Sequence, residues 1–149
     1  MQIETLLSPN RTRCGLTATS KRHALELLAQ TIAQDIGLDA DDLVRRFLAR
    51  ERLGSTGIGH GIAIPHCRIT TTQAVGALIT LAHPIEFDAI DSEPVDILFA
   101  MLVPDDAHDA HLKNLAALAS ALSITEFRQQ LRTANNNQTL FQAAITQPE

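Results

Sequence analysis

The spacing of apolar residues predicts two helices in the first third of the chain. After Ser20, leucines and isoleucines recur every three or four residues until Gly37, which is the period of one helix face. Ser20 is a residue type that caps helices, and Gly37 is one that ends them. We expect a second helix with Asp39 as its cap and Gly54 at its end.

Two apolar runs in the middle of the chain predict strands. Ala74–Leu81 and Val95–Val103 are apolar at nearly every position, which is typical of strands that are covered on both faces. A short extended piece is expected at Ile62–Ile64, because Pro65 disfavours helix at the residue before it. The connection over residues 83–93 mixes polar and apolar residues and yields no assignment.

The last third has the pattern of three helices. The first begins near Asp109, the second covers Glu126–Arg132, and the third covers Asn137–Ile145. Helices, then strands, then helices predict an α/β layered domain. A length of 149 residues favours a single domain over residues 1–149, which can bury a full core without disulfides or metal ions.

Composition and charge argue against nucleic acid as a partner. The chain has no Trp or Tyr and a net charge of −5, so neither base stacking nor general phosphate-backbone binding is expected. The charge is unevenly distributed. Residues 70–111 contain eight acids and no Lys or Arg, while basic residues gather around positions 45–52. Two interpretations remain open, ordinary solvated surfaces or a polarity used in docking.

The sequence contains no recognisable targeting or membrane-inserting segment. Residues 1–9 lack the pattern of a signal peptide, and the longest apolar stretch, Ile97–Val103, is too short to span a bilayer. Two cysteines, Cys14 and Cys67, are too few for a disulfide framework. We therefore expect a cytoplasmic protein with no membrane insertion.

A glycine-rich loop is the first candidate for a functional site. Four of the seven glycines lie within residues 54–61. The loop does not match the Walker A motif, the dinucleotide-binding GxGxxG motif or the GxSxG nucleophile elbow. Its backbone N–H groups, expected to be free, and the hydroxyls of Ser55 and Thr56 predict an anion-binding concavity.

His66, which closes this segment, is the second candidate. A neutral imidazole can attack a phosphoryl donor and form a phosphohistidine. Arg50, near the end of the preceding predicted helix, is placed to supply a cation for the phosphoryl oxygens. A purely structural histidine is the alternative. The neighbouring Cys67 is not expected to pair with His66, because adjacent side chains in an extended segment point to opposite faces.

His108 and His111 are three residues apart at the start of a predicted helix, so they share a face. They could form a metal pair, supply a second active-site imidazole, or simply be solvated. We expect no metal site, since no HExxH motif or cysteine cluster accompanies them.

The stretch from Arg50 to His66, with its segments GSTGIG and GIAIPH, resembles enzyme IIA of the phosphoenolpyruvate-dependent phosphotransferase system (PTS). The resemblance is to the fructose/mannitol type, and within it to the nitrogen-regulatory branch. The later segments IEFDAIDSEPVDILFAMLVP and AHLKNLAALA also resemble this family, and the similarity covers about residues 5–145. The resemblance implies an α/β fold in which a mixed β-sheet is flanked by helices.

The resemblance also implies roles for individual residues. His66 matches the phospho-acceptor, Arg50 the arginine beside it, and His111 a second histidine that helps to hold the phosphate. The loop packed around the site corresponds to Ser55, Thr56, Gly57, Gly59 and Gly61. Members of the nitrogen-regulatory branch usually have Asn at the position of His60 and Gly at that of Cys67, so the effect of these two departures is open.

The implied function is that of a phosphocarrier: a phosphotransferase component that forms a phosphohistidine intermediate and is not a turnover enzyme. It would accept phosphate on His66 from a histidine phosphocarrier (HPr- or NPr-like) protein and regulate protein targets by its phosphorylation state, with no cofactor. A free-standing sugar PTS IIA component that passes phosphate to a IIB protein is the alternative. A third hypothesis, a metal- or ligand-sensing module, would use His60, His66, Cys67, His108 or His111.

Overall fold

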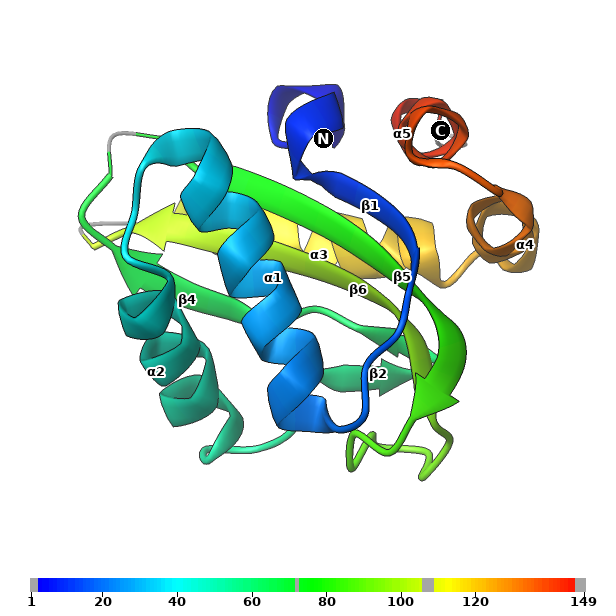
Figure 1. Cartoon of the computed structure of the whole chain (residues 1–149), viewed down its shortest axis with the longest axis horizontal. Coiled ribbons are helices and arrows are strands. Elements are labelled where there is room, and N and C mark those ends of the chain that lie inside the picture. The colour runs from blue at the N-terminus through cyan, green and yellow to red at the C-terminus, as the bar shows by residue number, and fades with distance from the viewer. Residues whose placement is uncertain (1–2, 72, 106–108, 147–149) are drawn as a thin grey trace.

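The computed structural model describes residues 3–71, 73–105 and 109–146, with the backbone alone over 109–112. The elements form three layers (Figure 1). Helices α1 (Lys21–Ile36) and α2 (Ala40–Glu51) cover one face of a β-sheet. The other face carries α3 (Asp109–Leu122), α4 (Thr125–Thr133) and α5 (Asn137–Ile145). Two short 3₁₀ turns, Ile3–Thr5 and Pro9–Arg11, precede the first strand.

The first two helices begin at the caps that the sequence predicts. The Ser20 hydroxyl accepts the N–H of His23, and the Asp39 carboxylate accepts N–H groups of the next turn. Gly37 ends α1 in the left-handed conformation, at φ +74°. The predicted end of the second helix at Gly54 is wrong. Helix α2 ends at Glu51, because the next residues form a tight turn that satisfies the last carbonyl groups.

The sheet is mixed, which confirms the predicted fold class. Its strands are β1 (Thr12–Leu16), β2 (Gly57–Gly59), β3 (Ile62–Ala63), β4 (His66–Ile69), β5 (Val75–Ile85) and β6 (Val95–Pro104). Strands β5 and β6 pair antiparallel in the middle, and β1 lies parallel to β5 at one edge. On the far side of β6, β3 and β4 follow one another parallel to it, and β2 pairs with β3.

The chain forms three strands that its sequence did not predict, namely β1, β2 and β4. All three are short. They contain glycine or lack a regular alternation of apolar and polar residues, so the local pattern does not mark them as strands. Strand β5 is longer than predicted and continues through Pro84 to Ile85. This is possible because its pairing with β6 is interrupted between Thr80 and Ile85, so the missing N–H of Pro84 breaks no ladder bond.

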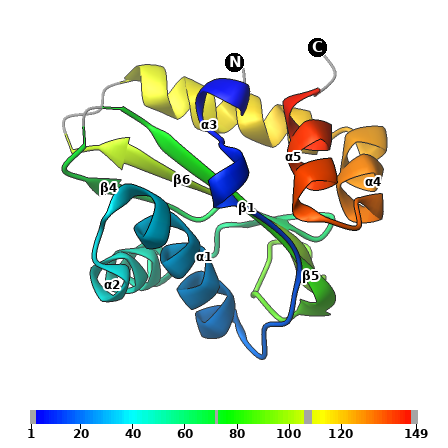
Figure 2. The ribbon, with the colours of Figure 1, turned by 45° about the horizontal axis from the view of Figure 1, so that its top comes forward.

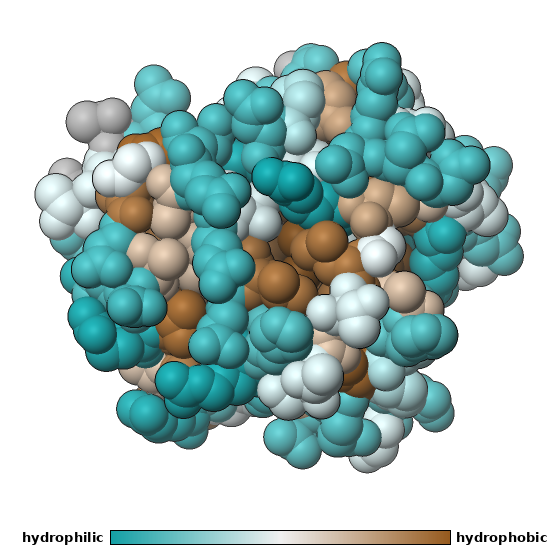
Figure 3. Space-filling model, viewed as in Figure 1, coloured by the Kyte–Doolittle hydropathy of each residue, from teal (hydrophilic) through white to brown (hydrophobic). Residues whose placement is uncertain are grey.

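Helices cover both faces of the sheet (Figure 2), and the two faces bury separate apolar clusters. Along β6, Leu98 and Leu102 face α1 and α2, whereas Phe99 and Met101 face the layer of α3, α4 and α5. This alternation explains why the strand has a continuous apolar sequence. Figure 3 shows apolar side chains gathered beside α1 near the middle of one face, surrounded by polar ones. Within the described residues, no helix is long and apolar enough to cross a membrane.

Candidate functional site

His66 is the first residue of β4. Strands β3 and β4 both pair with β6, and His66 lies just after the short break between them. The backbone of Ile64 and Pro65 joins the two strands along β6, and the Pro65 carbonyl accepts the N–H of Met101 at 2.9 Å. Proline suits this position, because its restricted φ fits extended backbone and only its carbonyl group is needed. His66 itself lies opposite Met101. Pairing with β6 thus fixes the backbone that carries the imidazole.

The hydrogen bonds of the His66 ring define which nitrogen is free. The ring atom Nδ1 lies 2.9 Å from the carbonyl oxygen of Ile64. Since a carbonyl oxygen can only accept, Nδ1 carries the proton of the neutral ring. The other nitrogen, Nε2, then has an available lone pair and lies 3.3 Å from Nε of Arg50, which donates to it. The half-buried ring therefore presents Nε2 as its nucleophilic atom.

The surroundings of His66 keep its imidazole neutral. Burial lowers the pKa of His66 below the usual value of 6.5, and the positive charge of Arg50 also lowers it. The hydrogen bond to Ile64 and the negative charge of Glu51 act in the opposite direction but do not outweigh the burial. A neutral ring at pH 7 is the form that can attack phosphorus.

Arg50 stands in the last turn of α2 and is held by the turn that follows the helix. Its Nη1 donates to the carbonyl oxygen of Gly54 at 2.8 Å, while Nε points to His66. Two of the five N–H groups of the guanidinium are thus used, and the other three make no hydrogen bond to a described side chain or backbone group. These groups can bind the oxygens of a phosphoryl group on Nε2.

An ion pair behind Arg50 is a part of the site that sequence reasoning missed. The Glu51 side chain is only 5% exposed, and Lys21 Nζ, from the start of α1, lies 2.7 Å from its Oε2. Glu51 Oε1 accepts both the backbone N–H and the hydroxyl of Thr56. One sequence signal could have revealed this residue. Glu51 is an acid in the last turn of a helix, where the helix dipole favours a cation.

The glycine-rich loop directs its polar groups toward the protein itself. The Ser55 hydroxyl donates to the Phe87 carbonyl and accepts the N–H of Gly57, while the Thr56 hydroxyl is bonded to Glu51. The N–H of His60 is bonded to Asp91. The expectation of free N–H groups in this loop is therefore wrong for Thr56, Gly57 and His60, because folding pairs them with nearby acceptors.

The glycines of this loop permit close packing. A Cβ atom on Gly57 would lie 2.7 Å from Cβ of Ala89, and one on Gly61 would collide with the side chains of Arg132 and Asp96. The loop thus lies directly against the segment after β5 and against α4. In the described structure, the predicted loop residues Ser55, Thr56 and Gly57 hold the backbone that follows α2. Gly59 and Gly61 let the loop approach Asp91 and Arg132 closely.

The structure describes the remaining candidates only in part. His111 belongs to the first turn of α3, but its side chain lies outside the described part of the structure, as does the whole of His108. Cys67 packs against the core beneath α1 and α2, and burial raises the pKa of its thiol to about 12. The side chains that are described include no group of three or more His, Cys, Asp or Glu residues arranged to hold a metal ion.

Comparisons with known proteins agree on one family. The model of the family described as "Phosphoenolpyruvate-dependent sugar phosphotransferase system, EIIA 2" matches residues 5–146. A nitrogen regulatory protein of Pseudomonas aeruginosa is 39% identical over 147 residues, which cover 97% of this chain and 96% of the relative. One from Escherichia coli is 40% identical over 144 residues, covering 95% and 88%.

A crystal structure of a similar protein has the same fold. The nitrogen regulatory protein IIA-Ntr from Neisseria meningitidis superposes with a TM-score of 0.85 at 34% identity, covering 95% of this chain and 98% of that one. The family resemblance seen in the sequence is confirmed.

Proposed function

The chain belongs to the EIIA 2 family of the phosphoenolpyruvate-dependent sugar phosphotransferase system, and we propose that it is the histidine phosphocarrier of a nitrogen-type branch. His66 accepts the phosphoryl group through Nε2. The donor is a phosphohistidine on a separate HPr- or NPr-like carrier protein. The phosphorylation state of His66 then sets which regulatory proteins the chain binds.

The transfer step follows from the two bonds of the His66 ring. The Nε2 lone pair attacks the phosphorus, the new P–Nε2 bond forms, and the electron pair of the donor's P–N bond returns to the donor ring. Nδ1 keeps its proton throughout, so the product ring carries a positive charge beside the phosphoryl oxygens. The carbonyl of Ile64 stabilises that charge through its 2.9 Å hydrogen bond.

Arg50 supplies the cation for the phosphoryl oxygens. A guanidinium that already lies 3.3 Å from the attacking atom needs little rearrangement to donate to oxygens bonded to that atom. In the free protein the hydrogen bond from Arg50 orients the His66 ring, with Nε2 facing the guanidinium. On phosphorylation the N–H groups of Arg50 donate to the phosphoryl oxygens instead. This contact between Arg50 and His66 is the observation that carries the proposal.

A labelling assay tests the acceptor. The full chain is incubated with phosphoenolpyruvate, enzyme I and the carrier protein, and the phosphoryl group on the chain is quantified. The wild type and a His60→Ala control should be labelled, and His66→Ala should not. Equal labelling of His66→Ala would refute the assignment. Two-dimensional ¹H–¹⁵N spectra of the labelled chain should place phosphorus on Nε2, and a signal from phosphorylated Nδ1 would contradict the proposed geometry.

The same preparation distinguishes regulation from sugar uptake. If the chain is a free-standing sugar component, the label should pass rapidly to a cognate IIB protein. If it is regulatory, the label should remain on His66, and pull-downs with phosphorylated and unphosphorylated chain should recover different proteins. The relatives named nitrogen regulatory proteins, at 39–40% identity, favour the second outcome.

A further inference from the structure

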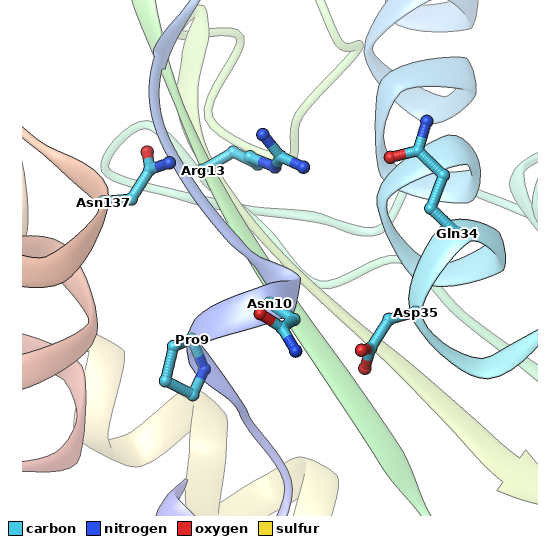
Figure 4. A pocket seen from close by; sticks show the side chains of 6 residues that line it. All are labelled: Pro9, Asn10, Arg13, Gln34, Asp35 and Asn137. Carbon is cyan, nitrogen blue, oxygen red and sulfur yellow. The ribbon is translucent and has the colours of Figure 1, made fainter.

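A polar cavity lies at the sheet edge farthest from His66. It is bounded by the turn before β1, by β1 itself, by the C-terminal half of α1 and by the start of α5, with β5 and β6 separating it from β4. Its volume is about 390 Å³, and it is lined by Pro9, Asn10, Arg13, Gln34, Asp35 and Asn137 (Figure 4). The phosphotransfer chemistry described above uses none of these residues.

Two arginines of this region are used in different ways. Each guanidinium nitrogen of Arg11 has a partner: Nη1 is 2.5 Å from Asp35 Oδ2, and the other two donate to the carbonyls of Leu6 and Gly76. The exposed side chain of Arg13 makes no hydrogen bond or ion pair with the part of the chain that the structure describes. Since Arg11 already neutralises Asp35, the cavity carries one uncompensated positive charge, that of Arg13.

The amide of Asn137, at the start of α5, supplies a second donor to the cavity. Its Oδ1 accepts the backbone N–H of Cys14 at 2.7 Å, so Nδ2 is directed away from that bond and stays available for a ligand. In Figure 4 the Arg13 guanidinium extends from β1 toward α1, where Gln34 lies, and Asp35 points toward Asn10. Asn137 lies on the other side of β1, beside α5. The cavity is thus lined by donors from β1 and α5 and by a carboxylate acceptor from α1.

We propose that this cavity binds a small carboxylate-bearing metabolite whose opposite end donates hydrogen bonds, the chemistry of an amino acid. Arg13 holds the ligand carboxylate, which a guanidinium fork matches in shape, and Asn137 Nδ2 adds a donor from the α5 side of the cavity. Oδ1 of Asp35, the oxygen that is not bonded to Arg11, accepts from the ligand's ammonium group. The chain would thus carry a metabolite site that is physically separate from the phosphorylated histidine.

A titration with ligands of increasing length tests this arrangement. Side-chain amide signals of Asn10, Gln34 and Asn137 are followed in ¹H–¹⁵N spectra of the full chain as glycine, 4-aminobutyrate, 6-aminohexanoate, acetate or inorganic phosphate is added. We expect saturable shifts with millimolar affinity for one of the amino acids and about tenfold weaker binding of acetate, which lacks the ammonium group. Equal binding of acetate, tighter binding of phosphate, or no saturable shift would overturn the proposal.

Two variants connect the shifts to the cavity. Arg13→Gln should weaken the best ligand at least tenfold, and Asn137→Asp should do the same while still accepting the N–H of Cys14. The matched control is Arg22→Gln, which removes an exposed arginine of α1 that does not line the cavity. Unchanged affinity in Arg13→Gln, or an equal loss in Arg22→Gln, would show that the ligand binds elsewhere. Unfolding curves of each variant confirm that the fold is retained.

Discussion

The guanidinium Nε of Arg50 lies 3.3 Å from Nε2 of His66, across the gap between the end of α2 and the start of β4. The cation and the nucleophile come from different layers of the fold. The contact places a positive charge where phosphoryl oxygens would arrive. The same charge makes protonation of the ring less favourable. Arg50 therefore favours the neutral ring before transfer and would attract the phosphoryl oxygens after it.

We predict that replacing Arg50 raises the pKa of His66. The positive charge of Arg50 lowers that pKa, so Arg50→Gln removes a repulsion against the imidazolium and the pKa moves back toward 6.5. The change is measured from the pH dependence of the His66 ring signals in ¹H–¹³C spectra.

Glu51→Gln supplies the opposing control for this pKa. The Glu51 charge raises the pKa of His66, so its removal should lower it, whereas Arg52→Gln, in the exposed turn beyond the helix, should leave it nearly unchanged. Shifts of the same sign in the Arg50 and Glu51 variants would indicate a general loosening of the site and contradict the electrostatic account.

The pH profile of phosphoryl transfer should extend to lower pH than an exposed histidine would allow. Only the neutral ring is nucleophilic, and the folded pKa of His66 is lowered, so the transfer rate should be level above pH 6.5 and fall only as the pH drops through the lowered pKa. Initial labelling rates between pH 5 and 8 measure this. In Arg50→Gln the acid limb should move to higher pH, and an unmoved limb would show that it belongs to the donor protein.

The partly buried ion pair of Lys21 and Glu51 should be strongly coupled in its contribution to stability. Lys21→Met leaves the Glu51 carboxylate, 5% exposed, without its counter-charge, and we expect a loss of about 2–4 kcal/mol in the free energy of unfolding. The double variant Lys21→Met/Glu51→Gln should cost less than the sum of the single changes, by about 1 kcal/mol or more. Urea unfolding of the wild type, the two single variants and the double variant gives this coupling energy. Additive costs would mean that the ion pair contributes nothing to stability.

Gly61 should tolerate a side chain much less well than Gly37. Both have similar positive φ angles, +79° and +74°, so the intrinsic strain of an alanine is similar. A Cβ atom on Gly61 collides with Arg132 and Asp96, whereas Gly37 has open space. We expect Gly61→Ala to cost about 1–3 kcal/mol more than Gly37→Ala in thermal or urea unfolding. Equal costs would show that Arg132 moves aside freely.

Cys67 should be an unreactive thiol although it follows the proposed phospho-acceptor directly. Burial raises its pKa to about 12, so the thiolate that reacts with disulfide reagents is scarce near pH 8. In the Cys14→Ser variant, labelling with a chromogenic disulfide should be slow in the native state and fast in urea. Rapid native labelling would mean that this edge of the sheet opens, and that Cys67 can serve as an oxidation site.

Local sequence patterns determined most of the helical framework. Leu25, Leu28 and Ile32 all reach the core from α1, and the capping residues Ser20 and Asp39 make the bonds that their positions predict. Such features depend on residues only a few positions apart. Strands such as β1 and β4 were missed because they are defined by long-range partners, Leu78 for Thr12 and Met101 for His66, which no local pattern identifies.

For the site, the chain's own residues pointed to His66 and Arg50 and, through the family motif, to their pairing. Only the tertiary structure decided which ring nitrogen is free, since that depends on the Ile64 carbonyl meeting Nδ1. It also decided that Glu51 is paired with Lys21. Arg11 forms an ion pair with Asp35, whereas the side chain of Arg13 has no such partner among the described residues. Residue types along a chain specify which groups can ionise or donate. The partners that satisfy them, and those left for a ligand, are set by contacts between distant segments.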